Sequence, residues 1–263
     1  MDKLVLRLDN KNTAEFTEVA ARFGYDQYGY VVTPNVDHII RLSEDASFRE
    51  LYADAAYTLL DSRFLSHLLR ITRRYRLPVC TGSDLTETIL GKTVNSDDPL
   101  VLIGGSERQA KQLCERYNLR ELYHYNPPMG FIHDPQRVEA CLQFIESHSP
   151  FRYCFLAVGS PQQEMLARQL KQRGVARGLA LCIGASINFL TGDEQRAPQW
   201  MQRTGTEWLF RLLQAPRRMA RRYLIRGPRI FRLLLNVEIV LRDVPVPNQM
   251  QINAAVTKGV QNA

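Results

Sequence analysis

The stretch Val158-Gly159-Ser160-Pro161-Gln162-Gln163-Glu164-Met165 indicates the fold class, because it joins an apolar run to a helical pattern. Residues 155–158 predict a short buried strand, Gly159 a tight turn, and residues 160–172 a helix. A strand that turns through glycine into a helix leaves free N–H groups beyond the strand, and such groups attract phosphate. The same stretch also fits an ordinary helix start with its polar side chains in solvent. Phosphate binding is therefore one of two interpretations at this point.

The first two-thirds of the chain alternates short apolar runs with amphipathic helical patterns. Such alternation predicts an α/β fold, with a Rossmann-like, mostly parallel sheet that carries helices on both faces. The predicted strands are residues 31–33, 56–60, 79–82, 100–104, 121–125, 155–158 and 179–183. The predicted helices are residues 36–42, 63–75, 107–117, 135–147 and 161–172.

Polar residues and glycines follow most of the predicted strands. Sheets of this kind bind their ligands beyond the carboxyl ends of the strands, where the strand order reverses. The residues at these positions are Asn35, Asp61, Gly82, Gly104-Gly105, Asn126-Pro127, Gly159-Ser160 and Gly184. We therefore expect the functional site at this edge of the sheet.

Positive charge is concentrated in the C-terminal third of the chain. Between Gln199 and Arg232 there are nine arginines, no lysine and one acidic residue, Glu207. This segment carries +8 and the whole chain +7, so the remaining residues sum to −1. The planar guanidinium fork suits bidentate phosphate contacts. An anionic partner is therefore expected to meet this segment.

The same segment predicts helices followed by a polar tail. Residues 207–213 predict an amphipathic turn, Pro216 can open a basic helix, and residues 230–241 predict a strongly apolar helix. A basic amphipathic helix beside an apolar one is typical of a membrane-surface element. The alternative is a helical pair packed on the core with its arginines in solvent. We expect a Rossmann-like core over residues 1–198, an Arg-rich helical, membrane-associating appendage over 199–245, and a flexible tail over 246–263.

Several classes of protein are excluded by composition. The five cysteines are an odd number, are well spread and form no C-x-x-C pair, which is typical of reduced residues in a cytosolic protein. The sequence has no signal-peptide apolar segment and no run near ~20 apolar residues, so we expect no membrane-spanning helix. His38, His124 and His133 lack metal-ligand spacing, and no metal site is expected.

A set of motifs follows the predicted strands in a fixed order. They are Thr33-Pro34-Asn35, Asp61, Gly104-Gly105, Tyr125-Asn126-Pro127-Pro128-Met129-Gly130-Phe131, Gly159-Ser160-Pro161-Gln162-Gln163-Glu164, Arg196-Ala197-Pro198, Glu207-Trp208, Arg211 and Arg221-Arg222-Tyr223. Over about residues 25–230, this order and spacing resembles the WecG/TagA/CpsF family of bacterial glycosyltransferases. The linked motifs are far more specific together than any one of them alone.

The resemblance implies an inverting, metal-independent glycosyltransferase that needs no cofactor. Such an enzyme moves a hexose or N-acetylhexosamine-type sugar from a UDP-sugar to an undecaprenyl-diphosphate-linked sugar, in cell-surface or exopolysaccharide biosynthesis. It would be a peripheral protein on the anionic cytoplasmic face of the inner membrane, without a nucleic-acid partner. Glucose, N-acetylmannosamine and its uronic acid remain open as donor sugars, and a homo-oligomer is compatible with the sequence.

The resemblance also implies roles for individual residues. Asp61 matches the general base, which takes the proton of the attacking sugar hydroxyl. Charge on the departing UDP must be stabilised, and the chain has no D-x-D triplet to hold a metal for this purpose. The arginines implied in that role are Arg211, Arg218 and Arg221. The other implied substrate-binding residues are Thr33, Asn35, Gly104, Asn126, Gly159 and Gln163, with the two glycines approaching the nucleotide by backbone.

Each of these roles has a simpler alternative. Asp61 could merely cap a helix starting at Ser62, and Asn35 could be a turn residue after Pro34. The family commonly has glycine after the base, where this chain has Ser62, which leaves the adjoining loop and the acceptor fit open. A basic nucleic-acid-binding protein is the alternative function, although no aromatic-interleaved basic face supports it. A Rossmann oxidoreductase is disfavoured because no G-x-G-x-x-G follows an early strand.

Overall fold

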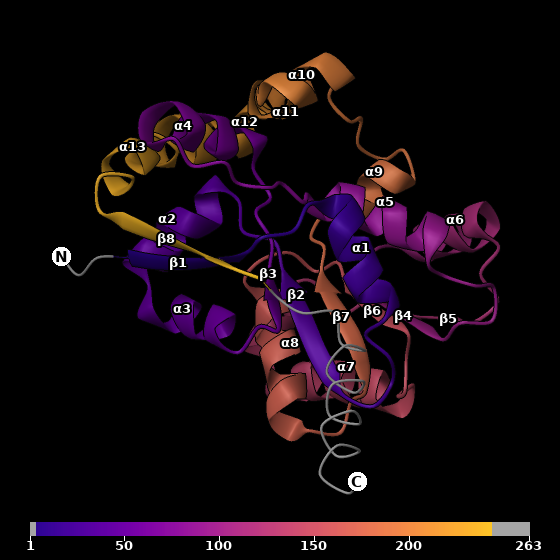
Figure 1. The fold of residues 1–263 in the computed structure, drawn as a ribbon. Helices are drawn as coiled ribbons and strands as arrows, with labels where there is room; N and C mark the ends of the chain where they lie inside the picture. The colour runs from indigo at the N-terminus through magenta and orange to yellow at the C-terminus, as the bar shows by residue number, and fades with distance from the viewer. Residues whose placement is uncertain (1–3, 244–263) are drawn as a thin grey trace, which may run out of the picture.

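The computed structural model describes residues 4–243, and the predicted tail over 246–263 lies outside them. Six parallel strands form the main sheet, in the spatial order β3-β2-β7-β6-β4-β5 (Figure 1). In chain order they are β2 (Tyr28–Val32), β3 (Tyr57–Thr58), β4 (Leu100–Ile103), β5 (Leu122–Tyr125), β6 (Tyr153–Leu156) and β7 (Gly178–Cys182). The predicted α/β class with a parallel sheet is confirmed.

Helices cover both faces of this sheet, each over its own apolar core. The core on one face includes residues of α1 (Thr13–Ala21), α5 (Gly82–Lys92), α6 (Glu107–Tyr117) and α9 (Ser186–Leu190). The core on the opposite face includes residues of α7 (Pro135–Ser147) and α8 (Gln162–Arg173), and α3 (Ala46–Ala53) packs against α8. Both cores contain fully buried strand residues, because alternate side chains of a strand point to opposite faces.

A third apolar core joins the two ends of the described chain. β1 (Leu4–Asp9) pairs in parallel with β8 (Val237–Arg242) to form a separate two-stranded sheet. Its buried residues pack with those of α2 (Val36–Glu44), α4 (Arg63–Arg73) and α13 (Arg229–Leu233). The Asp9 carboxylate connects this sheet to the main one, since it accepts hydrogen bonds from Thr58 N at 2.6 Å and Arg242 Nη2 at 3.1 Å.

The C-terminal third is helical until it reaches β8. It contains α10 (Gln199–Thr204), α11 (Glu207–Gln214), α12 (Pro216–Ala220), the π-helix η2 (Arg221–Arg226) and α13. The helices expected at 207–213 and after Pro216 are confirmed. The apolar helix expected over 230–241 is wrong beyond Leu233, because the segment continues as strand β8. Val237 and Ile239 are buried while Glu238 and Val240 face outward, the alternation that a half-buried strand requires.

Several other segments differ from the structure predicted for them. Residues 79–81 form no strand ladder; Cys80 N donates one hydrogen bond to Leu60 O, and Gly82 begins α5. The strand and helix patterns in the sequence also did not predict β1, α1, α3 or α5. A short 3-10 helix, η1 (Phe131–His133), follows the proline-rich loop after β5. The elements that follow β2, β4 and β6 start within two residues of their predicted positions, so the edge of the sheet is arranged as expected.

Candidate active site

The strand order reverses between β4 and β6. These strands are neighbours, but α6 follows β4 on one face of the sheet and α8 follows β6 on the other. Gly104 and Gly159 lie directly beyond this point with φ of +94° and +81°, a conformation that side chains rarely adopt. A Cβ on Gly104 would lie 2.9 Å from the carbonyl of Ala157. The predicted glycine turns therefore flank the crevice where such sheets bind ligands.

Gln163 is buried in the first turn of α8, at the edge of the same crevice. Its Oε1 accepts a hydrogen bond from Gly184 N at 2.9 Å, and its Nε2 donates to Glu164 Oε1 at 2.9 Å. Glu164 is buried as well, so the alternative that placed both side chains in solvent is wrong. Thr33 lies nearby, with its hydroxyl donating to Cys182 O at 3.4 Å. Two of the predicted residues thus meet at the end of β7.

Asn126 lies far from Asp61 along the edge. It is exposed and follows β5, the outermost strand on one side, whereas Asp61 follows β3, the outermost on the other. Five strand spacings of ~4.8 Å separate these strands, or roughly 24 Å. One ligand could contact both residues only by extending along most of the edge.

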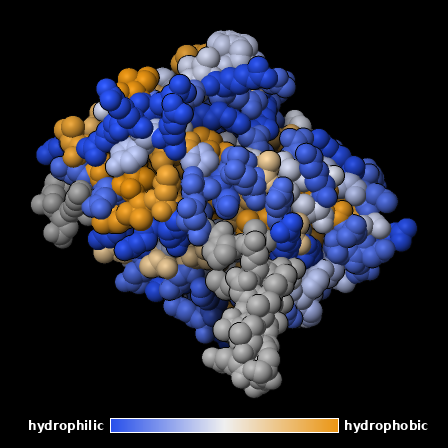
Figure 2. Space-filling model, in the orientation of Figure 1, coloured by the Kyte–Doolittle hydropathy of each residue, from blue (hydrophilic) through white to orange (hydrophobic). Residues whose placement is uncertain are grey.

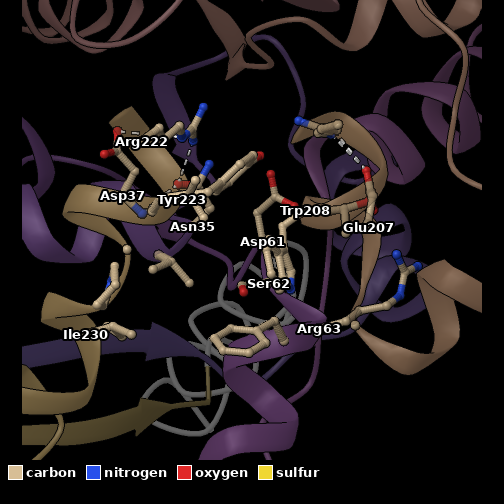
Figure 3. A pocket seen from close by; sticks show the side chains of 18 of the residues that line it. Asn35, Asp37, Asp61, Ser62, Arg63, Glu207, Trp208, Arg222, Tyr223 and Ile230 are labelled. Carbon is tan, nitrogen blue, oxygen red and sulfur yellow. Dashed lines mark hydrogen bonds and ion pairs between the residues drawn. The ribbon is translucent and has the colours of Figure 1, made fainter. Parts of the chain in front are cut away.

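A cavity of about 420 Å³ lies between this edge and the C-terminal helices (Figure 3). Asn35, Asp61 and Arg211 of the predicted set line it. The other lining residues are Val36, Asp37, Ser62, Arg63, Phe64, Thr81, Gln202, Gly205, Glu207, Trp208, Arg222, Tyr223, Leu224, Gly227, Pro228, Ile230 and Phe231. Its walls therefore come from two segments more than a hundred residues apart in sequence.

Asp61 projects into this cavity from the loop after β3. Its backbone N–H donates to Pro34 O at 2.9 Å, which fixes the loop against the one that follows β2. The cap of α4 is Ser62, whose hydroxyl accepts from Leu65 N at 3.1 Å. The alternative in which Asp61 serves as the helix cap is therefore wrong. The Asp61 carboxylate is left facing the cavity (Figure 3).

The surroundings of Asp61 favour its protonated form. Burial raises the pKa of Asp61 to about 7, and the nearby Glu207 and Asp84 carboxylates act in the same direction. Arg211 and the backbone N–H of Gly82 oppose this rise. A carboxyl group with a pKa near neutrality can accept a proton from a weakly acidic donor and later release it.

Arg211 forms one wall of the cavity together with Glu207. Both residues lie on α11 one turn apart, and Glu207 Oε1 accepts from Arg211 Nε at 3.2 Å and Nη2 at 2.9 Å. The guanidinium also lies 4.9 Å from the centroid of the Phe189 ring. These contacts hold the positive charge close to Asp61.

Arg222 forms the opposite wall. The sequence analysis included it in a motif but assigned the role to its neighbour Arg221. Arg222 Nη2 donates to Asn35 Oδ1 at 3.1 Å, and Arg222 Nε lies 3.9 Å from Asp37 Oδ2. The same Asn35 oxygen caps α2, so Asn35 has a structural role as a helix cap in addition to lining the cavity. The predicted Arg221 is instead exposed and does not line the cavity, while the side chain of Arg218 lies outside what the structure describes. Both arginines lie in the π-helix η2, and Arg222 is the one that faces the cavity.

The positions of these motifs agree with a comparison against known families. The model of the glycosyl transferase WecG/TagA/CpsF family matches residues 1–243. The chain belongs to the WecG/TagA/CpsF family. Membership supports glycosyl transfer, with a sugar donor and an acceptor as substrates. Because the match extends to residue 243, the arginine-rich helices and β8 are part of the WecG/TagA/CpsF unit.

The cavity of this WecG/TagA/CpsF chain also has an apolar side, and it contains a buried hydrogen-bond donor without a partner among the described residues. The sequence analysis identified neither feature. Trp208 and Tyr223 contact each other with ring centroids 6.1 Å apart, and Phe64 and Phe231 line the wall beyond them. Within the described part of the chain, Arg222 Nε is buried without a hydrogen-bond partner. An unpaired buried N–H is costly, and an anionic ligand could satisfy it.

Within residues 4–243, no three His, Cys, Asp or Glu side chains are grouped so that they could hold a metal ion. No helix in this range has the length and apolar character needed to cross a bilayer.

Proposed function

We propose that this chain is an inverting, metal-independent glycosyltransferase with a UDP-sugar donor. Its acceptor would be an undecaprenyl-diphosphate-linked sugar at the cytoplasmic face of the inner membrane, in cell-surface or exopolysaccharide biosynthesis. The observation that carries the proposal is the position of Asp61, which caps no helix and faces a cavity walled by arginines. Family membership supplies the class of reaction.

In this proposal Asp61 is the general base. Its carboxylate takes the proton from the acceptor hydroxyl as that oxygen bonds to the anomeric carbon. The bond from the anomeric carbon to the diphosphate breaks in the same displacement, which inverts the anomeric centre. A pKa near 7 leaves a large fraction of Asp61 ionised at neutral pH. The crevice beside Gly104 and Gly159 would bind the nucleotide through backbone N–H groups.

The negative charge that develops on UDP would be stabilised by arginines of the C-terminal helices. Arg211 and Arg222 both line the cavity, and the buried Arg222 Nε has no hydrogen-bond partner among the described residues. Preorganised cationic donors near a leaving group lower the barrier by stabilising its charge. In the proposal these side chains, with Arg218 and Arg221, supply what a divalent cation supplies elsewhere.

The acceptor's isoprenoid tail would lie against the apolar side of the cavity and continue into the bilayer. Leu224 and Phe231 line the cavity and are also more than half exposed, so they form its rim. Apolar and hydrophilic side chains alternate over the upper left of Figure 2, where α4, α12 and α13 lie in Figure 1. Exposed aliphatic groups among arginines suit the headgroup region of an anionic membrane.

The test is release of UDP from a panel of UDP-sugars in the presence of a lipid-diphosphate-linked sugar. The panel should include UDP-glucose, UDP-N-acetylmannosamine and its uronic acid, with nucleotide-free and acceptor-free controls. Acceptor-dependent UDP release, together with a product of inverted anomeric configuration by NMR, is the expected result. Tight duplex binding without any acceptor-dependent release would favour the nucleic-acid alternative.

A further inference from the structure

A second basic surface lies outside the C-terminal segment, at the end of α4. Residues 70–76, Arg70-Ile71-Thr72-Arg73-Arg74-Tyr75-Arg76, are all exposed and include four arginines and no acidic residue. Ile71 is 81% exposed although it is a large aliphatic residue. Among the residues that the structure describes, Arg70, Arg74 and Arg76 have no acidic partner. We refer to residues 70–76 as the α4 tip.

The α4 tip is attached to the C-terminal segment near the cavity. Arg73 Nη2 donates to Leu235 O at 3.0 Å, and Arg73 Nη1 donates to Val237 O at 3.2 Å. Leu235 is itself 74% exposed, and Phe231, on the cavity rim, is one helical turn before it. The other end of α4 contributes Arg63 and Phe64 to the cavity wall. The helix therefore runs from the cavity to the α4 tip.

The backbone at Arg74 is unusual. It ends α4 with φ of +58°, in the left-handed region where glycine or asparagine is favoured. The backbone N–H groups of Arg74 and Tyr75 both donate to Leu69 O, so Arg74 forms a left-handed cap of the kind that commonly ends a helix. Arginine is uncommon in this conformation, and glycine could replace it without loss of the cap.

We propose that the α4 tip, together with Phe231 and Leu235, forms a docking surface for an anionic lipid bilayer. The inference rests on the proposed function, and it adds to the C-terminal helices a contact from the N-terminal half of the chain. Unpaired arginines complement anionic headgroups, and the exposed Ile71 and Leu235 can bury apolar surface at the acyl boundary. A nucleic-acid backbone would use the arginines but would leave these aliphatic side chains in water.

Docking at both places would fix the orientation of the enzyme. The cavity lies between α4 on one side and η2 and α13 on the other, so contacts on both sides would hold its rim against the bilayer. A lipid-linked acceptor could then reach Asp61 without its tail leaving the membrane.

The charge test uses full-length protein and co-sedimentation with vesicles of phosphatidylglycerol and phosphatidylcholine, compared with phosphatidylcholine alone. The variant Arg70→Gln/Arg74→Gln/Arg76→Gln should weaken partitioning by roughly 100-fold at low salt, since each basic residue near the surface contributes about a factor of five. The control Lys92→Gln/Lys111→Gln/Arg120→Gln removes the same charge from exposed positions on α5, α6 and the following loop. An equal loss in both variants, or none in the first, would overturn the proposal.

Two single substitutions separate docking from folding. Arg74→Gly relieves the left-handed strain, so the Tm should be unchanged or higher while vesicle binding falls. Ile71→Ser should reduce the part of vesicle binding that survives high salt, whereas Val175→Ser, at a position 56% exposed elsewhere on the surface, should not. Unchanged binding by both α4 variants would contradict the inference.

The proposed transferase activity is tested by a separate measurement, the release of UDP in the absence of a bilayer. UDP release with a short-chain, water-soluble acceptor should be the same for wild type and the α4 variants, because no bilayer is present. No release by any of them would reject the transferase proposal and leave the vesicle result standing. Normal release with unchanged vesicle binding would reject only the docking surface. Binding of all proteins to duplex nucleic acid but not to vesicles would also reject it.

Discussion

Arg222 donates a hydrogen bond to the side chain of Asn35 at 3.1 Å, across 187 residues of sequence. The Asn35 oxygen that accepts it also accepts N–H groups at the start of α2, at 3.1 and 3.4 Å. One amide oxygen therefore holds both the loop after β2 and the π-helix of the C-terminal segment. The two walls of the cavity are joined at this point, so substitution of either residue should change the site that Asp61 faces.

Arg222→Ala should reduce kcat/KM by roughly 10- to 100-fold, as expected for the loss of a charged hydrogen bond to substrate and of the bond to Asn35. Arg222→Lys should restore little, because a single ammonium cannot reproduce the fork. Arg221→Ala, measured with the same donor and acceptor, should lose less, because Arg221 is exposed and does not line the cavity in this structure. A loss with Arg221→Ala as large as with Arg222→Ala would indicate that η2 rotates when substrate binds.

Asp61→Asn should lower turnover by roughly 10²- to 10⁴-fold and leave donor affinity nearly unchanged, because the amide cannot take a proton. Ser62→Ala is a matched control at the adjacent position. It removes the cap of α4 and should cost about 1 kcal/mol of stability with little effect on turnover. Near-normal turnover in Asp61→Asn, measured by UDP release, would remove Asp61 from the role of base.

The pH dependence of kcat/KM should show an acidic limb with an apparent pKa near 7. In the proposed mechanism the carboxylate of Asp61 is the active form, and burial raises its pKa to about 7, so activity should rise with pH through this region. Glu207 contributes to the raised pKa, and Glu207→Gln should therefore move the limb to lower pH. A limb that stays in place in Glu207→Gln, or moves to higher pH, would contradict this electrostatic arrangement.

Asp61→Asn should also be more stable than the wild type above neutrality. Between the ordinary aspartate pKa of 3.8 and the raised value of about 7, folded Asp61 holds a proton that the unfolded chain has lost. Its contribution to stability therefore falls as pH rises through this window. The amide stays neutral, so Tm at pH 8 should exceed that of the wild type by roughly 2–6 °C, with little difference at pH 4. Equal Tm values at pH 8 would argue against a buried Asp61 charge.

Removal of divalent cations should leave the activity intact. If arginines stabilise the departing UDP, then EDTA treatment and a magnesium titration should both leave UDP release unchanged, whereas Arg211→Ala should reduce it sharply. Activity abolished by EDTA and restored by magnesium would reject the metal-independent mechanism.

The sheet and its edge were predictable because their signals are local. Strand β6, the Gly159 turn and α8 follow each other within about twenty residues, and α6 and α7 begin and end at their predicted residues. The role of Ser62 as cap was not predicted, although capping preferences made either Asp61 or Ser62 suitable. Only the geometry of the first turn of α4 decides between these two residues.

The cavity walls were not predictable, because they depend on packing between distant segments. The π-helix that turns Arg222 inward has no sequence signature of its own, and Phe64 lies on the wall only because α4 packs beside the C-terminal helices. Val237 and Ile239 were assigned to a helix because their apolar run fits either structure, and their strand partner is at the other end of the chain. A cut at Gln199 would leave β1 unpaired, so single substitutions test the C-terminal segment more cleanly.

The pairing of β1 with β8 also determines when the enzyme becomes complete during its synthesis. β1 is translated about 230 residues before its partner strand, which begins at residue 237. At typical elongation rates the nascent chain waits roughly 10–50 s with the apolar side of β1 uncovered. The arginine wall is translated in the same late interval, just before β8. A ribosome that stalls before this point would thus hold a chain with the crevice at the sheet edge formed and no cavity, and with an exposed strand on which quality-control chaperones could act.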